Sequence, residues 1–475
     1  MRYLILLLLI VAAAAARAAD KTTQHTLALP TGPFALTAII ETIKLANPQG
    51  APLVEVVATA FLHDGEKPRP VTFAFNGGPG AASAFLDLGA IGPWRVPLVI
   101  PVVPSQDPAP VDNAETWLPF TDLVFIDPPG TGYSRVTGTG DNAGRPFHSV
   151  DGDIATLATV VHRWLETHHR LDSPVFLAGE SYGGFRAPRL ARALLEQEGT
   201  GVSGLVMISP VLDFNGRESP YDPMRWVARL PSLVAAARHA ATRADVQDAE
   251  TYAAGDYLAD LVRGPNDALA SARMTARVAG LAGLDPALVR RRGGRIDLED
   301  FLRDRTPGQV ATPYDATLLA ADPFPAAPHD NSPDAVLDGL RGTLTSGMLL
   351  IYQRLDWQPD GAPARHYNLL SNNVAHDWDY GRSNARPESM TALRQYLALD
   401  PAAHALVVHG LYDLVTPYFA SKLLLDQVPE TTPPGRLSLR VYAGGHMSYI
   451  QQSSRAALRD DAAAMIGQAL AARLR

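Results

Sequence analysis

A serine stands between two glycines in the run Gly179-Glu180-Ser181-Tyr182-Gly183. The pattern G-x-S-x-G is typical of a sharp strand-to-helix turn on which a serine hydroxyl projects as a nucleophile. The apolar residues 174–178 before it predict a buried strand, and residues 185–195 after it predict a helix. This context makes Ser181 the candidate nucleophile.

A serine hydroxyl needs a base to take its proton, and the base needs an acceptor that fixes its tautomer. His446 lies in a Gly-Gly-His-Met loop after one predicted strand, and Asp413 follows the strand before it. Loops at the carboxyl ends of parallel strands converge on one crevice. The order Ser181, Asp413, His446 is also the chain order of the triads in α/β-hydrolases. We therefore predict a catalytic triad, and we expect the rival base His409, at a strand end, to be packed.

The run Asn76-Gly77-Gly78-Pro79-Gly80 directly follows a predicted buried strand at residues 71–75. Three glycines around a proline exclude the interior of a helix or strand. One interpretation is a tight loop without a chemical role. The sharper one is a loop whose backbone N–H groups bind a developing oxyanion, as in hydrolases that carry a serine on such a turn.

The elements around these motifs alternate between apolar strands and helices. Further buried strands are predicted at residues 122–126, 204–209, 405–409 and 437–442, and helices at 149–165, 387–398 and 453–472. Residues 34–46 and 52–62 indicate an early antiparallel hairpin. This order predicts an α/β-hydrolase fold, with a mostly parallel central sheet flanked by helices.

The character of the chain changes near residue 215. From there to about residue 370 it has helical Ala/Arg/Leu segments at 224–244 and 267–283, Pro-rich turns and no clear strand. We interpret residues 215–370 as an inserted, mainly helical cap. The core then has two parts, residues 19–214 and residues 371–475.

Residues 1–18 have the pattern of a secretory signal peptide, with Arg2, an apolar run and an Ala16-Arg17-Ala18 cleavage site. The run is too short to span a membrane, and no later stretch reaches about 18 apolar residues. We therefore expect export to the periplasm or the extracellular space. The chain has no Cys, which excludes disulfides and Cys-ligated metals. A formal net charge of −8 without basic clusters argues against nucleic acid and anionic membranes as partners.

Four motifs together resemble the serine carboxypeptidases of the carboxypeptidase Y type. They are the run at 76–80, the run at 179–184, Gly410-x-x-Asp413 and His446-Met447. The similarity extends from about residue 34 to the end of the chain and is weakest across the predicted cap.

The resemblance implies a role for each triad residue and needs no cofactor or metal. Ser181 would be the nucleophile, His446 the general base and then acid, and Asp413 its orienting partner. The backbone N–H groups of Gly78 and Tyr182 would form the oxyanion hole.

The resemblance also implies that Asn76 and Glu180 bind the free C-terminal carboxylate of a peptide substrate. A glutamate can donate a hydrogen bond to a carboxylate only when it is protonated. We therefore predict that peptide hydrolysis is favoured at acidic pH.

The sequence departs from the family pattern at some positions. Ala74 stands where the family usually has Trp, Ala81 where it usually has Cys, and the disulfides of the eukaryotic members are absent. These departures concern the rim of the site and its subsites, not the triad. An Ala-rich, Cys-free chain with a short signal peptide resembles a bacterial exported branch.

Three alternatives remain at the level of the sequence. An esterase or acyl hydrolase would use the same fold and triad. An aminopeptidase for N-terminal proline carries a related Gly-Gly-Pro-Gly loop, but that loop begins with His where this chain has Asn76. A non-catalytic binding protein would not need the triad and both oxyanion donors. Side-chain preference and oligomeric state are not encoded in these motifs.

Overall fold

The computed structural model of the protein describes residues 20–64, 68–98, 102–105, 109–140, 142–215, 219–327, 332–361, 365–381, 386–430 and 433–474. The signal peptide predicted for residues 1–18 lies outside these residues. Within the described ranges, no helix is both long enough and apolar enough to cross a membrane.

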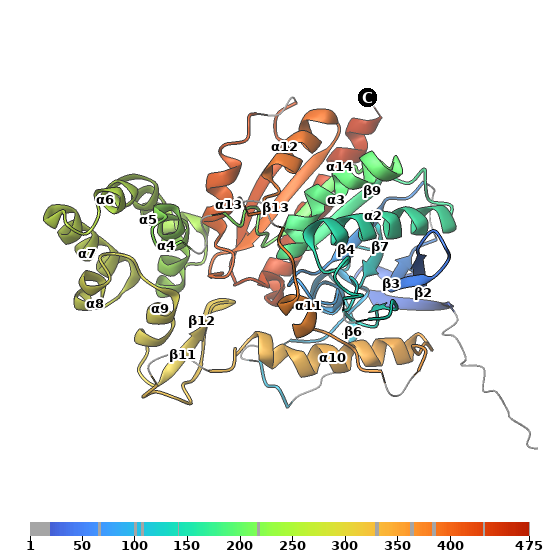
Figure 1. Ribbon diagram of the computed structural model, residues 1–475, viewed down its shortest axis with the longest axis horizontal. Coiled ribbons are helices and arrows are strands. Elements are labelled where there is room, and N and C mark those ends of the chain that lie inside the picture. The colour runs from blue at the N-terminus through green and yellow to red at the C-terminus, as the bar shows by residue number, and fades with distance from the viewer. Residues whose placement is uncertain are drawn as a thin grey trace, which may run out of the picture.

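A ten-stranded sheet forms the centre of the molecule (Figure 1). Its strand order is β1-β2-β3-β7-β4-β9-β10-β13-β14, with β8 paired to β3 beside this path. The six strands from β7 to β14 in this order run parallel, and β1 to β3 form an antiparallel edge. The predicted α/β-hydrolase fold and the early hairpin are confirmed. The strands are β1 Lys21–Leu29, β2 Gly32–Ala46, β3 Pro52–Leu62, β4 Val71–Phe75, β7 Asp122–Ile126, β8 Arg135–Val136, β9 Val175–Glu180, β10 Gly204–Ile208, β13 His404–Gly410 and β14 Leu437–Tyr442.

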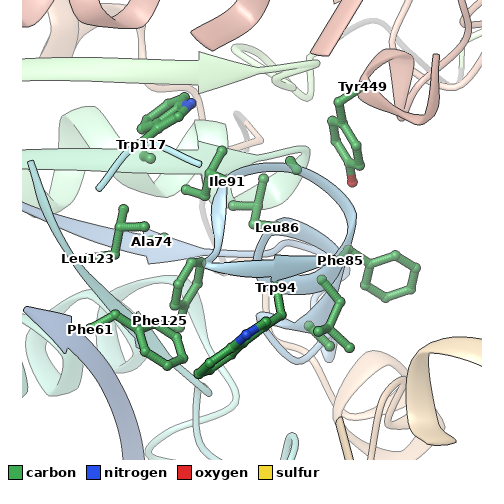
Figure 2. Packing of buried hydrophobic residues seen from close by; sticks show 14 of the residues in the cluster. Phe61, Ala74, Phe85, Leu86, Ile91, Trp94, Trp117, Leu123, Phe125 and Tyr449 are labelled. Carbon is green, nitrogen blue, oxygen red and sulfur yellow. The ribbon is translucent and has the colours of Figure 1, made fainter. Parts of the chain in front are cut away.

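Helices cover both faces of the sheet. Successive side chains of a strand point to opposite faces, so they belong to two different cores. Phe73 of β4 packs in one core with Trp164 of α2, whereas its neighbour Ala74 belongs to the other. The first core lies under α2 Val150–Thr167, α3 Tyr182–Glu198 and α12 Met390–Leu399; the second lies under α10 Leu337–Arg354 and α14 Gln452–Arg473. Figure 2 shows part of the second core, where the rings of Phe61 and Trp94 meet edge to face at 5.7 Å.

Between β10 and β13 the chain leaves the sheet and builds a group of helices with its own core, drawn in yellow-green beside the sheet in Figure 1. These helices are α4 Pro223–Arg238, α5 Gln247–Tyr252, α6 Leu258–Arg263, α7 Ala268–Ala282, α8 Pro286–Arg291 and α9 Leu298–Asp304. The expectation of no strand in this region is wrong, because β11 Gln309–Thr312 and β12 Asp315–Ala321 form an antiparallel hairpin. β11 has four residues, and β12 has a single β-branched residue, Thr317, so the local strand pattern is weak.

The remaining elements are small. They are α1 Ala84–Leu86 with the following π-helix η1 Asp87–Ile91, β5 Trp94–Arg95, β6 Val111–Asp112, the 3₁₀ turn η2 Arg243–Val246, the π-helix η3 Ala253–Tyr257, α11 Asn372–His376, α13 Tyr418–Leu425 and the 3₁₀ turn η4 Ser448–Ile450. Two of them lie beside the predicted site residues, because α13 follows Asp413 and η4 follows His446.

Candidate active site

Ser181 lies on the turn between β9 and α3 with a strained backbone, φ 58° and ψ −118°. A positive φ is uncommon for a residue with a Cβ. The two glycines of the motif allow the close packing around this turn. A Cβ on Gly179 would lie 2.0 Å from the carbonyl oxygen of Gly183, and a Cβ on Gly183 would lie 2.5 Å from that of Phe75. The local structure is therefore the predicted strand, sharp turn and helix.

His446 and Asp413 lie in loops that follow two neighbouring parallel strands, β14 and β13. The Nδ1 atom of His446 is 2.8 Å from Oδ2 of Asp413. Asp413 is fully buried, and its Oδ1 accepts the backbone N–H groups of Val415 and Thr416. Burial acts to raise the pKa of Asp413, but His446 and the hydrogen bonds of His446 and Thr416 outweigh it and hold that pKa below its usual value. An ionised Asp413 keeps the proton of His446 on Nδ1 and leaves Nε2 to act as a base.

Strand β10 connects the serine to the histidine and aspartate. The N–H of Ser181 donates to the carbonyl of Ile208, the last residue of β10, at 2.8 Å. The next residue, Ser209, donates its hydroxyl to the carbonyl of His446 at 2.7 Å. The structure thus brings the three predicted triad residues to the carboxyl end of one set of parallel strands.

Thr416 was not anticipated from the sequence. Its hydroxyl lies 2.6 Å from Oδ2 of Asp413, 3.0 Å from the carbonyl of Ser209 and 3.0 Å from Nδ1 of His446. One hydroxyl therefore contacts the carboxylate, the imidazole and the end of β10. No motif marks this residue, because its role depends on the fold of the loop after β13.

Thr416→Val is expected to lower kcat/KM by about tenfold, because a hydrogen bond to a charged group is lost without a large change in shape. The measurement is hydrolysis of an activated ester at several pH values, together with the melting temperature. Thr416→Ser is the matched control and should restore the rate. An equal loss in both variants would contradict a role for the hydroxyl.

His409 is packed, as expected. It lies fully buried within β13, and its Nε2 is 2.8 Å from the hydroxyl of Ser421. Burial lowers the pKa of His409 to about 4. The imidazole is therefore a neutral core group at neutral pH.

The loop Asn76–Gly80 packs directly against the turn that carries Ser181. A Cβ on Gly77 would lie 2.5 Å from the backbone nitrogen of Tyr182, and Gly78 has a φ of 99° that favours glycine. Tyr182 is the first residue of α3, so its N–H has no partner within the helix. The N–H groups predicted to bind an oxyanion thus belong to two segments in direct contact.

A buried ion pair between Arg186 and Asp153 lies against the Asn76–Gly80 loop. Arg186 of α3 donates to Oδ2 of Asp153 in α2 at 2.7 Å and to the backbone carbonyl of Asn76 at 2.8 Å. Sequence reasoning missed this arginine, since nothing in its helical surroundings separates it from surface arginines. Arg186 fixes where the loop leaves β4.

Asn76 and Glu180, the predicted carboxylate-binding pair, are buried and hydrogen-bonded to each other. The side-chain amide of Asn76 donates to Oε2 of Glu180 at 2.7 Å, and its own oxygen accepts the backbone N–H of Leu86 at 2.9 Å. The hydroxyl of Tyr449 donates to the same Oε2 at 2.7 Å. Tyr449 is a third member of this group that sequence reasoning missed.

Glu180 is set up to hold a proton in mildly acidic conditions. Burial raises its pKa to about 6, although the charge of His446 and the hydrogen bonds from Tyr449 and Asn76 act in the opposite direction. The negative charge of Asp413 adds to the rise. This glutamate therefore changes from a hydrogen-bond donor to an anion near pH 6.

A cavity of about 470 Å³ opens between α4 and α13 and borders Thr416. Much of its lining is apolar and includes Val211, Leu212, Met224, Val415, Leu423 and Leu424. No cluster of three or more side chains able to hold a metal occurs among the described residues.

Comparison with known proteins gives a family match over part of the chain. Residues 61–240 match the family model described as serine carboxypeptidase. The pheromone-processing carboxypeptidase kex1 of Talaromyces marneffei is 35% identical over 124 residues, which cover 26% of this chain and 18% of the relative. The corresponding protein of Ajellomyces capsulatus is 35% identical over 144 residues, 30% of this chain and 20% of that one. The aligned part of the chain thus spans about a fifth of the length of these relatives.

The fold also matches a solved structure over most of its length. The crystal structure of a prohormone-processing carboxypeptidase from Saccharomyces cerevisiae, Kex1(delta)p, aligns with a TM-score of 0.58. The alignment covers 91% of both chains at 16% sequence identity. At that identity the likeness concerns the fold.

Proposed function

We propose that this chain, which matches the serine carboxypeptidase family over residues 61–240, is a serine-type carboxypeptidase. It releases residues from the free C-terminus of peptides through an acyl-enzyme intermediate. The observation that carries the proposal is the buried Asn76–Glu180 pair, hydrogen-bonded at 2.7 Å, with Glu180 directly preceding Ser181.

In the proposed reaction the Ser181 hydroxyl attacks the carbonyl carbon of the last peptide bond. His446 takes the hydroxyl proton as the C–O bond forms, and then gives it to the leaving amine as the C–N bond breaks. The N–H groups of Gly78 and Tyr182 bind the oxyanion. Water then attacks the acyl ester by the same steps and frees Ser181.

The carboxylate pair determines which bond reaches the serine. Protonated Glu180 donates a hydrogen bond to the substrate carboxylate, a contact that its ionised form would replace with repulsion. Because Glu180 is adjacent to Ser181 in the chain, a carboxylate held by Glu180 places the last peptide bond near the nucleophile. Release of one residue at a time at acidic pH is the expected result.

The test is digestion of a set of peptides, each with a free and an amidated C-terminus, followed by mass spectrometry near pH 5. Free ends should lose residues stepwise, and the amidated twins should react at least about 100-fold more slowly, the loss expected when buried polar groups are left unpaired. Ser181→Ala serves as the blank. Cleavage of esters without loss of peptide residues would favour an esterase, and internal cleavage would also contradict the proposal.

We propose further that residues 215–370 act as a cap over a core made of residues 19–214 and 371–475. Helix α4 supports this assignment because it lines the cavity beside Thr416. The pattern of residues 1–18 supports export, and the Cys-free composition supports a bacterial exported branch.

A further inference from the structure

Tyr449 lies on η4, three residues after His446, and its side chain reaches the carboxyl group of Glu180. The residue is 1% exposed. Its ring packs on the π-helix after α1, where a Cβ on Gly89 would lie 2.9 Å from the ring. Figure 2 shows the ring extending from its turn with the hydroxyl oxygen toward the side of Leu86 and Phe85. The phenol is thus held in place by packing as well as by its hydrogen bond.

The two donors to Glu180 act on the same oxygen atom. Asn76 and Tyr449 each donate to Oε2 at 2.7 Å. The amide of Asn76 cannot turn over without cost, because its oxygen already accepts the N–H of Leu86. In the described part of the chain, no hydrogen bond reaches Oε1 of Glu180.

This asymmetry decides where the proton of Glu180 resides. An oxygen that accepts two hydrogen bonds is poorly suited to carry a proton, so the proton belongs on Oε1. With the carboxyl fixed in this way, the O–H group is presented at the oxygen that no protein donor occupies.

We infer that Tyr449 is a positioning residue for the carboxylate-binding site. By donating to Oε2 it holds the Glu180 carboxyl in one orientation and reserves Oε1 as the donor to the C-terminal carboxylate of the substrate. The inference rests on the proposed carboxypeptidase function and adds to it a residue that acts through Glu180.

The charged and titratable groups facing Glu180 set the direction of the expected pH effect. They are His446 and Asp413 of the triad, Tyr449, and Tyr314 from the loop between β11 and β12. The hydrogen bond from Tyr449 favours the ionised form of Glu180 and lowers its pKa. Removing this donor therefore raises the pKa of Glu180.

The test is Tyr449→Phe, assayed as a pH profile of kcat/KM on an N-blocked dipeptide and on its C-terminal methyl ester. With the free acid, the rate at about pH 5 should fall about fivefold, the effect of losing one hydrogen bond to a neutral carboxyl group. The decline at higher pH should move to more alkaline pH. With the ester, both the rate and the profile should match those of the wild type.

Tyr442→Phe is the matched control. Its hydroxyl also donates to a carboxylate, Oδ2 of Asp461 at 2.5 Å, but this pair joins β14 to α14. The control should leave both profiles unchanged. Equal losses of Tyr449→Phe on acid and ester, or an unshifted profile on the acid, would overturn the inference. If the wild type gives the same pH profile of kcat/KM on the free acid as on the methyl ester, the proposed function is refuted. This result differs from those that overturn only the role of Tyr449, so the two failures are distinguishable.

Discussion

Replacing Ser181 by alanine is expected to abolish peptide and ester hydrolysis, with kcat falling by about a million-fold. Ser181 lies on a turn with a positive φ, from which its hydroxyl projects. The N–H of Ser181 donates to Ile208 at the end of β10, and the next residue, Ser209, donates to the carbonyl of His446. A fluorophosphonate probe should label the wild type once per chain and leave the variant unlabelled, as read by mass spectrometry.

Ser173→Ala is the matched control for this variant. Ser173 is a buried serine before β9, at the opposite end of the strand from Ser181, and its hydroxyl accepts a hydrogen bond from Arg170. Activity and labelling should survive this change. The double variant Ser181→Ala/His446→Ala should be no slower than Ser181→Ala, because the two residues act as one unit. Labelling of Ser181→Ala, or additive losses in the double variant, would indicate another nucleophile.

The places of the three predicted triad residues in the fold could be predicted, because each follows a strand of a parallel sheet. Apolar runs located the strands before Ser181, Asp413 and His446, and parallel strands bring their carboxyl ends to one edge. In the structure β13 and β14 are neighbouring parallel strands. The loops that follow them therefore lie side by side, with Nδ1 of His446 2.8 Å from Oδ2 of Asp413. Local pattern and topology were sufficient for this part.

Contacts between distant side chains could not be predicted in the same way. Tyr449 and Glu180 are 269 residues apart, and neither element carries a pattern that pairs them. Thr416 likewise resembles an ordinary residue before a helix. Such contacts depend on how loops pack, which a periodicity of two or 3.6 residues does not encode.

Some boundaries also differed for physical reasons. Strand β1 was missed, because its first six residues alternate between partly buried and exposed positions and its stability comes from pairing with β2. Helix α3 begins at Tyr182, earlier than predicted, and runs through Pro188. Pro188 is the seventh residue of α3, so the helix lacks the hydrogen bond that an N–H at this position would donate to the carbonyl of Gly184.

Replacing Glu180 by glutamine is expected to keep free-acid peptides as good substrates at alkaline pH. With a pKa of about 6 for Glu180, about 1% of the wild type is protonated near pH 8, so the variant should be about 100-fold faster there. Near pH 5 the two enzymes should agree within a few-fold. The measurement is kcat/KM for an N-blocked dipeptide across this range.

The geometry explains why glutamine can replace the protonated acid. Its amide oxygen would take the place of Oε2 and accept the hydrogen bonds of Asn76 and Tyr449. Its NH₂ group would then stand where Oε1 stood and donate at every pH. Glu180→Ala is the control, since it removes the donor and should be slow on free acids at both pH values.

The titration of Glu180 changes the stability of the fold in the same direction as free-acid hydrolysis. The two effects must therefore be measured separately. The pKa of Glu180 in the folded state is raised to about 6. The contribution of Glu180 to the free energy of unfolding is therefore complete at pH values below its pKa in the unfolded chain, and it is lost as the pH rises through about 6. Glu180→Gln should therefore also melt at a higher temperature than the wild type near pH 8, and at a similar temperature near pH 4. Hydrolysis of the methyl ester needs no carboxylate contact, so the ratio of the two enzymes' ester rates at one pH reports their relative folded fractions. If free-acid activity of the wild type rises up to about pH 8 and Glu180→Gln follows the same profile, Glu180 does not bind the substrate carboxylate as a proton donor.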